Sequence, residues 1–255
     1  MPGDTLMVMI ASAPEHPGGF RLDVAFEAPP GITVLFGPSG SGKSTTLAAI
    51  AGLVRPSAGR ISLGAQVWFD HLERVHHPVH RRGVSLVFQS LALFPHLSAL
   101  ENAAYGIDRA VPRAERRQRA GALLERMKVA HLVDRKPASY SGGEAQRVAL
   151  ARAFARQPTL LLLDEAFSAM DRELRLELAR DVRQLVDELA IPAILVTHHR
   201  MEARAMADRL VLIAGGRVTQ EGALAQVWPR LALLRDEDAF ASLDRTPMPI
   251  LRRAR

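Results

Sequence analysis

Cysteine is absent from the 255 residues of this chain. Its absence excludes disulfide frameworks, cysteine-based zinc sites and cysteine nucleophiles, and it is typical of proteins from a reducing compartment. Long hydrophobic runs are absent too, because no stretch approaches the roughly 18–20 apolar residues that a helix needs to span a bilayer. The N-terminus has no charged segment leading into an apolar one, so no secretory signal is expected. These absences predict a soluble, cytoplasmic chain.

Lysine and aromatic residues are scarce. Lysine occurs only at Lys43, Lys128 and Lys136, the net charge is +6, and aromatic residues make up 5% of the chain. The remaining basic residues are arginines that fall on expected helix faces, such as Arg113 and Arg116, without the interleaved aromatic residues that stack on bases. No nucleic-acid partner is therefore expected. Hydrophobic residues, at 48%, are enough for a large buried core.

Short apolar runs alternate with amphipathic helix patterns along most of the chain. Five of these runs are bounded by turn residues and are expected to be buried strands: Ile32–Phe36, Gly83–Phe88, Thr159–Leu163, Ile194–Val196 and Leu210–Ile213. Residues 91–158 are instead rich in helix formers and arginine, and Pro112 is expected to be the first residue of a helix there. The alternation predicts an α/β fold built on a parallel sheet and interrupted by a helical insertion.

A glycine-rich segment, called the phosphate loop below, follows the first of these strands and opens a helix. It fits the pattern G-x-x-x-x-G-K-[ST] and consists of Gly37, Pro38, Ser39, Gly40, Ser41, Gly42, Lys43 and Ser44, with Thr45 next in the helix. Glycines let successive N–H groups converge on phosphate oxygens, and the helix N-terminus adds positive potential there. We expect Lys43 to reach the β- and γ-phosphates and Ser44 to ligate Mg²⁺. The sequence therefore predicts binding of a nucleoside triphosphate.

Two carboxylates, Asp164 and Glu165, end the strand predicted at residues 159–163. By themselves they would indicate only a strand end that faces solvent. Beside a phosphate loop, they lie where parallel sheets bind ligands. We then expect Asp164 to hold Mg²⁺ through water, and Glu165 to be the general base that activates the attacking water.

Ser141, Gly142, Gly143 and Glu144 have the pattern of a capping box at the start of another helix. An ordinary helix cap accounts for the serine and the glutamate. It does not account for two glycines in the first turn, where they weaken a helix. Their small size leaves the helix N-terminus open to a phosphate.

With this segment in place, the chain resembles the ATP-binding-cassette (ABC) ATPases, whose signature usually reads Leu-Ser-Gly-Gly-Gln. Gln89 resembles the glutamine of the family's Q-loop, Ser168–Asp171 resembles its D-loop and His198 resembles its switch histidine. The resemblance implies an α/β fold of the P-loop NTPase type, with a RecA-like parallel sheet core, an N-terminal antiparallel β region and an inserted helical subdomain.

The resemblance also divides the chain into parts. It places an ATP-binding α/β core, with its β subdomain, at residues 1–90 and 159–228. It places the helical subdomain, which carries the signature, at residues 91–158, and a C-terminal tail at residues 229–255.

Site residues follow from the same resemblance, with ATP and Mg²⁺ as cofactors. Four residues are expected to take part in hydrolysis: Lys43, Gln89, Glu165 and His198. Gln89 is expected to join Ser44 and Asp164 at the metal. The signature, residues 141–144, is expected to contact the γ-phosphate of ATP held by a second copy, in a head-to-tail sandwich dimer. Phe20 is the aromatic residue that can stack on adenine, and packing at the sheet edge is an equal alternative.

Four positions depart from the family's usual residues. Tyr140 stands where leucine is usual, and Glu144 stands where glutamine is usual. A carboxylate near a γ-phosphate is repulsive unless it turns back onto its own backbone, which a capping box allows. Ala166 and Met170 replace the usual proline and leucine. These departures concern the rate of turnover more than the reaction itself.

The segment Ala92–Asn102 resembles the surface on which bacterial oxyanion-importer ATPases receive a membrane subunit. Residues 30–37 and 222–228 resemble molybdate-importer ATPases. Those proteins normally continue into a C-terminal regulatory domain, which we do not expect in this chain. The resemblance implies integral-membrane permease subunits as partners, with a periplasmic binding protein in the full system. It implies a peripheral position on the cytoplasmic face of the inner membrane, and uptake of molybdate or a related oxyanion such as sulfate or tungstate.

A soluble ABC-type ATPase coupled to a nucleic-acid or translation process is the alternative. Such proteins usually carry a second cassette, a coiled coil or an extended basic region, and the sequence has none of these. A phosphate-loop kinase is disfavoured by the signature-like segment at residues 141–144.

Overall fold

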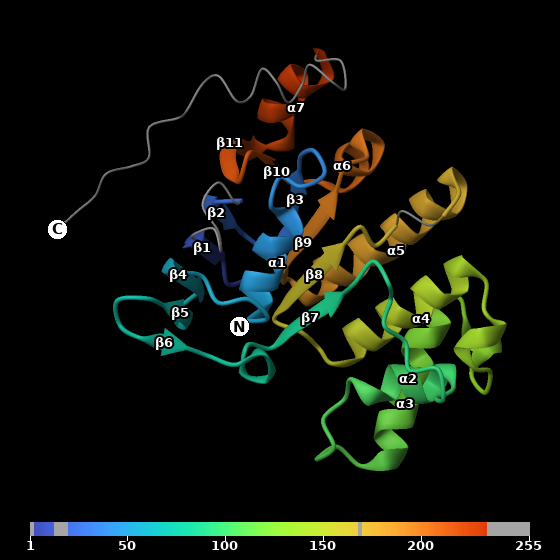
Figure 1. Cartoon of the computed structure of the whole chain (residues 1–255). Coiled ribbons are helices and arrows are strands. Elements are labelled where there is room, and N and C mark those ends of the chain that lie inside the picture. Colours follow the sequence, from blue (N-terminus) through green and yellow to red (C-terminus); the bar gives the residue numbers. More distant parts are fainter. Residues whose placement is uncertain (1–2, 13–19, 168–169, 234–255) are drawn as a thin grey trace.

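Strands from both ends of the described chain join one sheet. The computed structural model describes residues 3–12, 20–167 and 170–233, and within these ranges the strand order is β6-β5-β4-β1-β2-β11-β10-β3-β9-β8-β7 (Figure 1). The strands are β1 (Leu6–Ser12), β2 (Leu22–Ala28), β3 (Gly31–Phe36), β4 (Ala58–Leu63), β5 (Gln66–Asp70), β6 (Val75–His76), β7 (Val84–Val87), β8 (Leu160–Asp164), β9 (Pro192–Thr197), β10 (Arg209–Ala214) and β11 (Arg217–Ala223).

Strands β10, β3, β9, β8 and β7 run parallel, and their carboxyl ends are in register. Phe36 of β3 lies opposite Thr197 of β9, and Asp164 of β8 lies opposite Val196. On the other side of β8, Val87 of β7 pairs with the residue before Asp164. The loops that follow β3, β7, β8 and β9 consequently leave the sheet along one edge, where parallel sheets bind ligands.

The remaining strands are mainly antiparallel. β1 pairs with β2 and with β4, and the sheet continues from β4 through β5 to β6. In Figure 1 these strands lie on one side of the parallel strands, and the helices of the insertion lie on the other side. The predicted fold, a parallel core with an N-terminal antiparallel β region and an inserted helical subdomain, is confirmed.

The helices lie between the strands and after the last of them. They are α1 (Lys43–Ala51), α2 (Ala99–Tyr105), α3 (Arg113–Arg126), α4 (Gly142–Ala155), α5 (Arg172–Leu189), α6 (Arg200–Met206) and α7 (Leu224–Leu233), with short 3₁₀ turns at Val79–Arg81, Ala130–Leu132 and Pro137–Ser139. The insertion consists of α2, α3 and α4, between β7 and β8. Its two joints to the sheet contain three non-glycine residues with positive φ angles, Leu91 (59°), Ala92 (46°) and Gln157 (53°).

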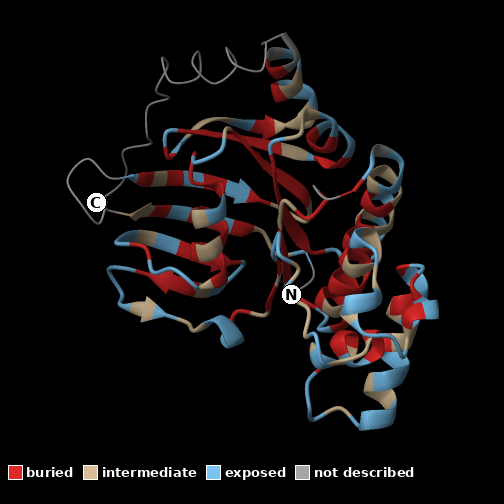
Figure 2. Ribbon diagram, turned by 45° about the vertical axis from the view of Figure 1, so that its right-hand side comes forward, coloured by how far each residue is buried: buried red, intermediate tan, exposed pale blue. Residues whose placement is uncertain are grey.

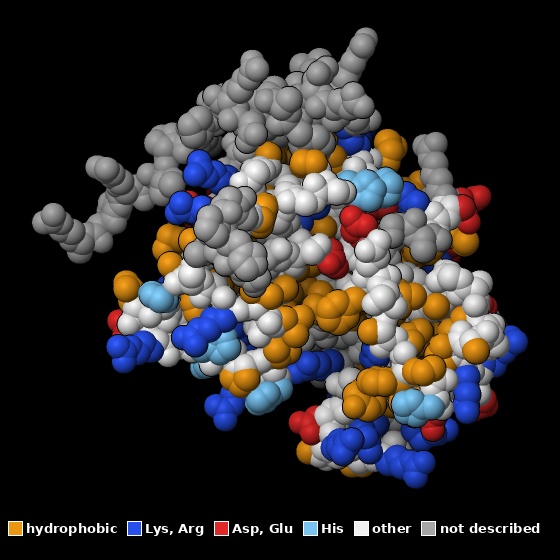
Figure 3. Space-filling view, in the orientation of Figure 1, with side chains coloured by type: hydrophobic (Ala, Val, Ile, Leu, Met, Phe, Trp, Pro, Cys, Tyr) orange, Lys and Arg blue, Asp and Glu red, His pale blue; other side chains and the backbone are white. Residues whose placement is uncertain are grey.

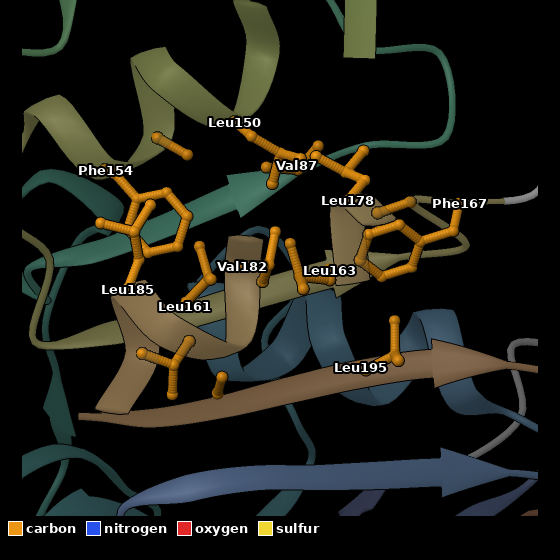
Figure 4. Packing of buried hydrophobic residues seen from close by; sticks show 14 of the residues in the cluster. Val87, Leu150, Phe154, Leu161, Leu163, Phe167, Leu178, Val182, Leu185 and Leu195 are labelled. Atoms are coloured by element: carbon orange, nitrogen blue, oxygen red, sulfur yellow. The ribbon is translucent and has the colours of Figure 1, made fainter. Parts of the chain in front are cut away.

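Hydrophobic side chains pack on both faces of the sheet, in two clusters. In the first cluster, Leu161, Leu163 and Leu195 of the sheet pack with Phe154 of α4 and Val182 of α5 (Figure 4). The second cluster joins α1 and the antiparallel strands to the opposite face, because alternate residues of a strand point to opposite faces. Buried residues therefore follow the sheet and the facing sides of the helices, and the outer sides of the helices are exposed (Figure 2).

Some elements differ from the sequence prediction. Pro112 is the N-cap of α3, with a ψ angle of 141°, and not its first helical residue. Proline fixes φ but leaves ψ free to be extended, so it fits either position. The helix α6, the strand β11 and the helix α7 were missed, since α6 is short and β11 is largely polar. The helix α7 also runs through Pro229 to Leu233, across the predicted start of the tail.

Arg82 is a buried charge that holds the C-terminal end of α1. Its Nη1 donates to the carbonyl oxygens of Ala49 (2.9 Å) and Ile50 (2.8 Å), and its Nε donates to that of His77 (2.9 Å). The last carbonyls of a helix have no partner within the helix, so Arg82 satisfies two of them. Burial lowers the pKa of Arg82, and these carbonyls keep the charged form hydrogen-bonded.

Replacing Arg82 by methionine is expected to lower the free energy of unfolding by about 3 kcal/mol, because buried carbonyls lose their donors. Urea denaturation followed by circular dichroism measures this change. Arg81→Met is the control, since Arg81 is exposed and its loss should change the free energy by less than about 0.5 kcal/mol. Equal midpoints for the two variants would contradict the structural role of Arg82.

Candidate functional site

The phosphate loop connects β3 to α1, and its backbone requires glycine. Gly40 and Gly42 have φ angles of 77° and 102°, in the left-handed region that favours glycine. A Cβ at Gly37 would lie 2.1 Å from the carbonyl oxygen of Ile213, so the loop passes too close to β10 for a side chain. Thr46 Oγ1 donates to the Gly42 carbonyl at 2.8 Å, in the first turn of α1. The loop therefore leads directly into a helix N-terminus, which is an anion-binding arrangement.

The side chain of Lys43 is buried inside this loop. Its Nζ donates to the carbonyl oxygens of Gly37 (2.9 Å) and Pro38 (2.6 Å) and lies 3.4 Å from Ser41 Oγ. Burial lowers the pKa of Lys43, and the charges of Glu165 and of its neighbour at position 164 act in the opposite direction. The ammonium group is thus held at the centre of the loop, where a phosphate can replace the carbonyls as its partner.

Ser44 and Asp164 meet at the carboxyl edge of the sheet. Ser44 Oγ donates to Asp164 Oδ1 at 3.0 Å, although the two residues are 120 positions apart in the sequence. Burial raises the pKa of Asp164, and the hydrogen bond from Ser44 partly opposes this rise. The structure thus brings together two of the oxygen-bearing side chains that the sequence analysis assigned to Mg²⁺. Their role as metal ligands stays a prediction.

Glu165 lies between Gln89 and His198. Its Oε2 accepts from Gln89 Nε2 at 3.2 Å, and its Oε1 lies 3.0 Å from His198 Nδ1. Its own backbone is left-handed, with a φ of 48°, and its N–H donates to Val196 O at 3.0 Å. The ends of three neighbouring strands thus bring a carboxylate, an amide and an imidazole together. Such a carboxylate can accept a proton from water while its neighbours orient that water.

The signature segment forms the N-terminal end of α4. Ser141 Oγ accepts from the Glu144 N–H at 3.3 Å, and the Glu144 carboxylate accepts from the Ser141 N–H at 2.7 Å, which confirms the capping box. Gly142 and Gly143 are the first two residues of the helix. Among the described residues, none of the hydrogen bonds of Ser141 or Glu144 reaches the phosphate loop. Within one chain, the two predicted nucleotide-binding segments are therefore not brought together by these bonds.

Phe20 lies against the phosphate loop. A Cβ at Gly42 would come within 2.7 Å of the Phe20 ring, and one at Gly216 within 3.2 Å. The side chain is 46% exposed, so part of the ring is free to contact a planar group. Adenine stacking by Phe20 stays a prediction.

The D-loop residues Ser168 and Ala169 lie outside the described residues. Asp171 follows them and caps α5, since its Oδ1 accepts from the N–H groups of Glu173 (3.0 Å) and Leu174 (3.1 Å).

A network behind His198 was missed by the sequence analysis. Thr197 Oγ1 donates to the buried carboxylate of Glu202 at 2.6 Å, and Arg175 Nη1 lies 3.2 Å from that carboxylate. Arg175 Nη2 also donates to Met170 O at 2.7 Å. The network ties the loop after β9 to the segment before α5. The sequence gives one local sign of this network: Thr197 and Glu202 lie five positions apart, on either side of the start of α6.

Asn102 holds the segment Ala92–Asn102 from within α2. The side chain is fully buried, and its Nδ2 donates to the carbonyl oxygens of Phe94 (3.1 Å), Leu97 (3.1 Å) and Ser98 (3.0 Å). Its Oδ1 accepts from the Phe94 N–H at 2.9 Å. One amide therefore fixes the fold of this loop.

Arg152 of α4 holds the other end of the same segment. Its guanidinium donates to Ala92 O (2.7 Å) and Leu91 O (2.8 Å) and lies 5.5 Å from the centre of the Phe94 ring. The Phe94 ring in turn lies 4.4 Å from that of Tyr105, which is 58% exposed. On the face seen in Figure 3, hydrophobic side chains gather over the insertion, with basic side chains along its lower edge.

The sequence profile of the ABC transporter family matches residues 22–168. The chain belongs to this family. It is 45% identical over 215 residues to the molybdenum import ATP-binding protein ModC of Albidiferax ferrireducens, covering 84% of this chain. It is 44% identical over 223 residues to the molybdate/tungstate import ATP-binding protein WtpC of Archaeoglobus fulgidus, covering 87% of this chain. It is also 44% identical over 213 residues to the sulfate/thiosulfate import ATP-binding protein CysA of Yersinia pestis, covering 81% of this chain.

The match covers different shares of these three relatives. The matched part spans 58% of the ModC protein and 57% of the CysA protein, but 90% of the WtpC protein.

Among solved structures, a dimeric ATP-binding cassette in a post-hydrolysis state, bound to ADP and Pi, matches with a TM-score of 0.73 and 28% identity. That match covers 86% of this chain and 98% of the other. Within the described ranges, no helix combines the length and the apolar character needed to cross a membrane.

Replacing Asp164 by asparagine is expected to stabilise the folded chain at neutral pH. Burial raises the folded-state pKa of Asp164 above its unfolded value of about 3.9, so ionisation costs the native state free energy. As the pH rises from the unfolded-state pKa of Asp164 to its folded-state pKa, the free energy of unfolding of the wild type should fall relative to that of the variant, by at most about 1.4 kcal/mol per pH unit. Above the folded-state pKa, the difference in free energy of unfolding between the two proteins should be constant. Urea unfolding in the presence of a chelator, from about pH 3.5 to 8, measures it.

Asp134→Asn is the control for this pH dependence, because Asp134 is exposed. Its free energy of unfolding should differ from that of the wild type by less than about 0.5 kcal/mol at neutral pH. An Asp164→Asn variant that is less stable than the wild type at neutral pH would contradict a raised pKa for Asp164 in the folded state.

Proposed function

We propose that this chain is the ATP-hydrolysing subunit of an ABC importer for molybdate or a related oxyanion. The observation that carries the proposal is the position of the Glu165 carboxylate between Gln89 and His198, next to the Ser44–Asp164 pair. A proton acceptor then lies beside a loop built for phosphates, which is what hydrolysis of a nucleoside triphosphate requires.

Ser44, Asp164 and Gln89 would hold Mg²⁺. Hydroxyl, carboxylate and amide oxygens are the hard donors that this ion prefers, and Ser44 Oγ and Asp164 Oδ1 are 3.0 Å apart. When bound, Mg²⁺ neutralises charge on the β- and γ-phosphates.

The chain's own residues divide the remaining work. Lys43 exchanges its loop carbonyls for phosphate oxygens and offsets their charge. Glu165 accepts the proton of the attacking water, and Gln89 and His198 orient the carboxylate and that water. Phe20, partly exposed beside Gly42, stacks on the adenine ring.

A second copy of the chain completes each site. The signature at residues 141–144 makes no hydrogen bond to the phosphate loop of its own chain within the described residues, so its open helix end serves the ATP of a partner copy. The related cassette is dimeric, which supports an assembly of two copies of this chain. In the assembly that we propose, two ATP lie at the interface. The core at residues 1–90 and 159–228 supplies the phosphate loop, and the helical subdomain at 91–158 supplies the signature.

The surface around Phe94 and Tyr105 receives a permease subunit. Phe94 is half-buried and held by Arg152 and Asn102, and the exposed Tyr105 ring packs on it, so the contact surface is fixed in place before a partner arrives. The carbonyls that Arg152 binds are only two or three positions after Gln89, so movement at this surface reaches the hydrolytic site.

The relatives support an oxyanion as the transported solute. Their names give molybdenum, molybdate or tungstate, and sulfate or thiosulfate. An importer of this class works with a periplasmic binding protein and holds its ATP-hydrolysing subunits on the cytoplasmic face of the inner membrane. The binding protein and the permease, rather than this chain, select the solute.

Replacing Glu165 by glutamine is expected to reduce ATP hydrolysis by about 10²- to 10⁴-fold, because the general base is lost. ATP binding should persist, and the variant should accumulate as an ATP-dependent dimer. Phosphate release measures the first effect, and analytical ultracentrifugation with and without ATP measures the second.

Lys43→Ala in the Glu165→Gln background is the matched control, since it removes the phosphate contact and should abolish the dimer. A Glu165→Gln chain that stays monomeric at saturating ATP would overturn the sandwich arrangement. Hydrolysis at the wild-type rate would overturn the role of Glu165.

Replacing both Phe94 and Tyr105 by alanine is expected to reduce transport-coupled ATP hydrolysis about tenfold in proteoliposomes that contain the permease subunits. Buried aromatic anchors at an interface are each worth about 1–2 kcal/mol or more. Hydrolysis by the chain alone should change by less than about twofold.

Leu72→Ala is the control for this coupling test, because Leu72 is 88% exposed and lies in the turn after β5, on the antiparallel side of the sheet. An equal loss of coupled activity in both variants would contradict a specific docking surface around Phe94.

A further inference from the structure

Both oxygens of the Glu144 carboxylate have partners in the structure. Oε2 accepts from the N–H of Ser141 at 2.7 Å and from its Oγ at 2.8 Å. Oε1 lies 2.8 Å from Nε2 of His131, a residue 13 positions earlier in the chain. The capping box accounts for the first oxygen only, so the histidine is an additional partner.

The histidine donates in this contact. Hydrogen bonds from Ser141 and then from His131 lower the pKa of Glu144 to about 2, so the carboxylate is ionised at neutral pH. An ionised carboxylate only accepts hydrogen bonds, and Nε2 of His131 is therefore the donor.

The position of His131 is fixed from both sides. It lies in the 3₁₀ turn Ala130–Leu132, whose neighbours Val129 and Leu132 are buried in the core. The same turn follows Met127, whose carbonyl oxygen accepts from Nη1 of Arg147 in α4 at 3.3 Å. The imidazole is exposed, but its backbone is tied to the helix that carries Glu144.

The charge of Glu144 matters because of where it lies. In the proposed dimer, the open end of α4 at Gly142 and Gly143 meets the γ-phosphate of the partner's ATP. A negative side chain in the first turn stabilises a helix, because the helix N-terminus carries partial positive charge. The same side chain repels a second anion that approaches this end. A partner is needed that holds this carboxylate to one side of the helix end.

We propose that His131 is a positioning residue for this contact: by donating to Glu144 Oε1, it turns the carboxylate away from the open end of α4. The γ-phosphate of ATP on a second copy then meets the N–H groups of the signature. This inference rests on the proposed sandwich dimer.

Dimerisation of the Glu165→Gln chain by ATP tests the proposal. An exposed pair of this kind is worth about 0.2–1 kcal/mol, which is about 1.4- to fivefold in an equilibrium constant. The dimer contains two such contacts, so His131→Leu should raise its dissociation constant about two- to 25-fold. His131→Gln keeps a side-chain donor and should recover part of this loss.

A variant without the carboxylate separates this role from a structural one. If His131 acts through Glu144, then Glu144→Gln should suppress the defect, and His131→Leu in that background should change the dissociation constant by less than about twofold. ATP affinity of the monomer, measured by fluorescent-nucleotide titration at low protein concentration, should stay unchanged in all of these variants. His71→Leu, which replaces an exposed histidine in the turn after β5, is the matched control.

The outcomes are distinct. If Glu165→Gln alone stays monomeric with ATP, both the dimer and the inference fail. If it dimerises and His131→Leu has no effect, only the inference fails. If His131→Leu weakens the dimer equally with Glu144 and with glutamine at position 144, His131 acts through the fold and not through the carboxylate, and the inference also fails.

Discussion

The rest of the molecule depends on the register of four parallel strands. Because β3, β9, β8 and β7 end at the same level, four unrelated loops leave one edge of the sheet together. This alone brings Lys43, Gln89, Glu165 and His198 within reach of one another, although they lie far apart in the sequence. A shift of one residue in any of these pairings would turn the following side chain to the other face. The hydrophobic clusters on both faces therefore protect the site by fixing the register.

Much of this arrangement could be predicted from the sequence, because it depends on residues that lie close together along the chain. The phosphate loop needs glycines at fixed intervals between a strand and a helix, and in the structure Gly40 and Gly42 have left-handed φ angles that favour glycine. The capping box at Ser141 and Glu144 involves residues only three positions apart, and it is present as predicted. The same holds for the buried strand that ends at Asp164.

Contacts between distant segments were not predictable in this way. The sequence contains no sign that Arg152 binds Leu91 and Ala92, because the partners are about 60 positions apart and their carbonyls carry no residue identity. Arg175 and Glu202 likewise meet only because α5 packs beside α6. The helix α6 itself was missed, since seven residues give too short a pattern to distinguish a helix. Long-range polar contacts thus stabilise the segments that carry the predicted site residues.

The left-handed residues at the two joints of the insertion have a further consequence. For residues other than glycine this conformation costs about 1–2 kcal/mol each. Both connections between the sheet and the insertion therefore contain backbone that is unfavourable by itself. Leu91 and Ala92 keep it while Arg152 holds their carbonyls, and Gln157 keeps it at the end of α4, where its N–H donates to Phe154 O. The hydrogen bonds of Arg152 and Gln157, together with the packing of α4 on the sheet, therefore hold the insertion in place against the backbone preference of its joints. Loosening those hydrogen bonds would relieve torsional strain at both joints.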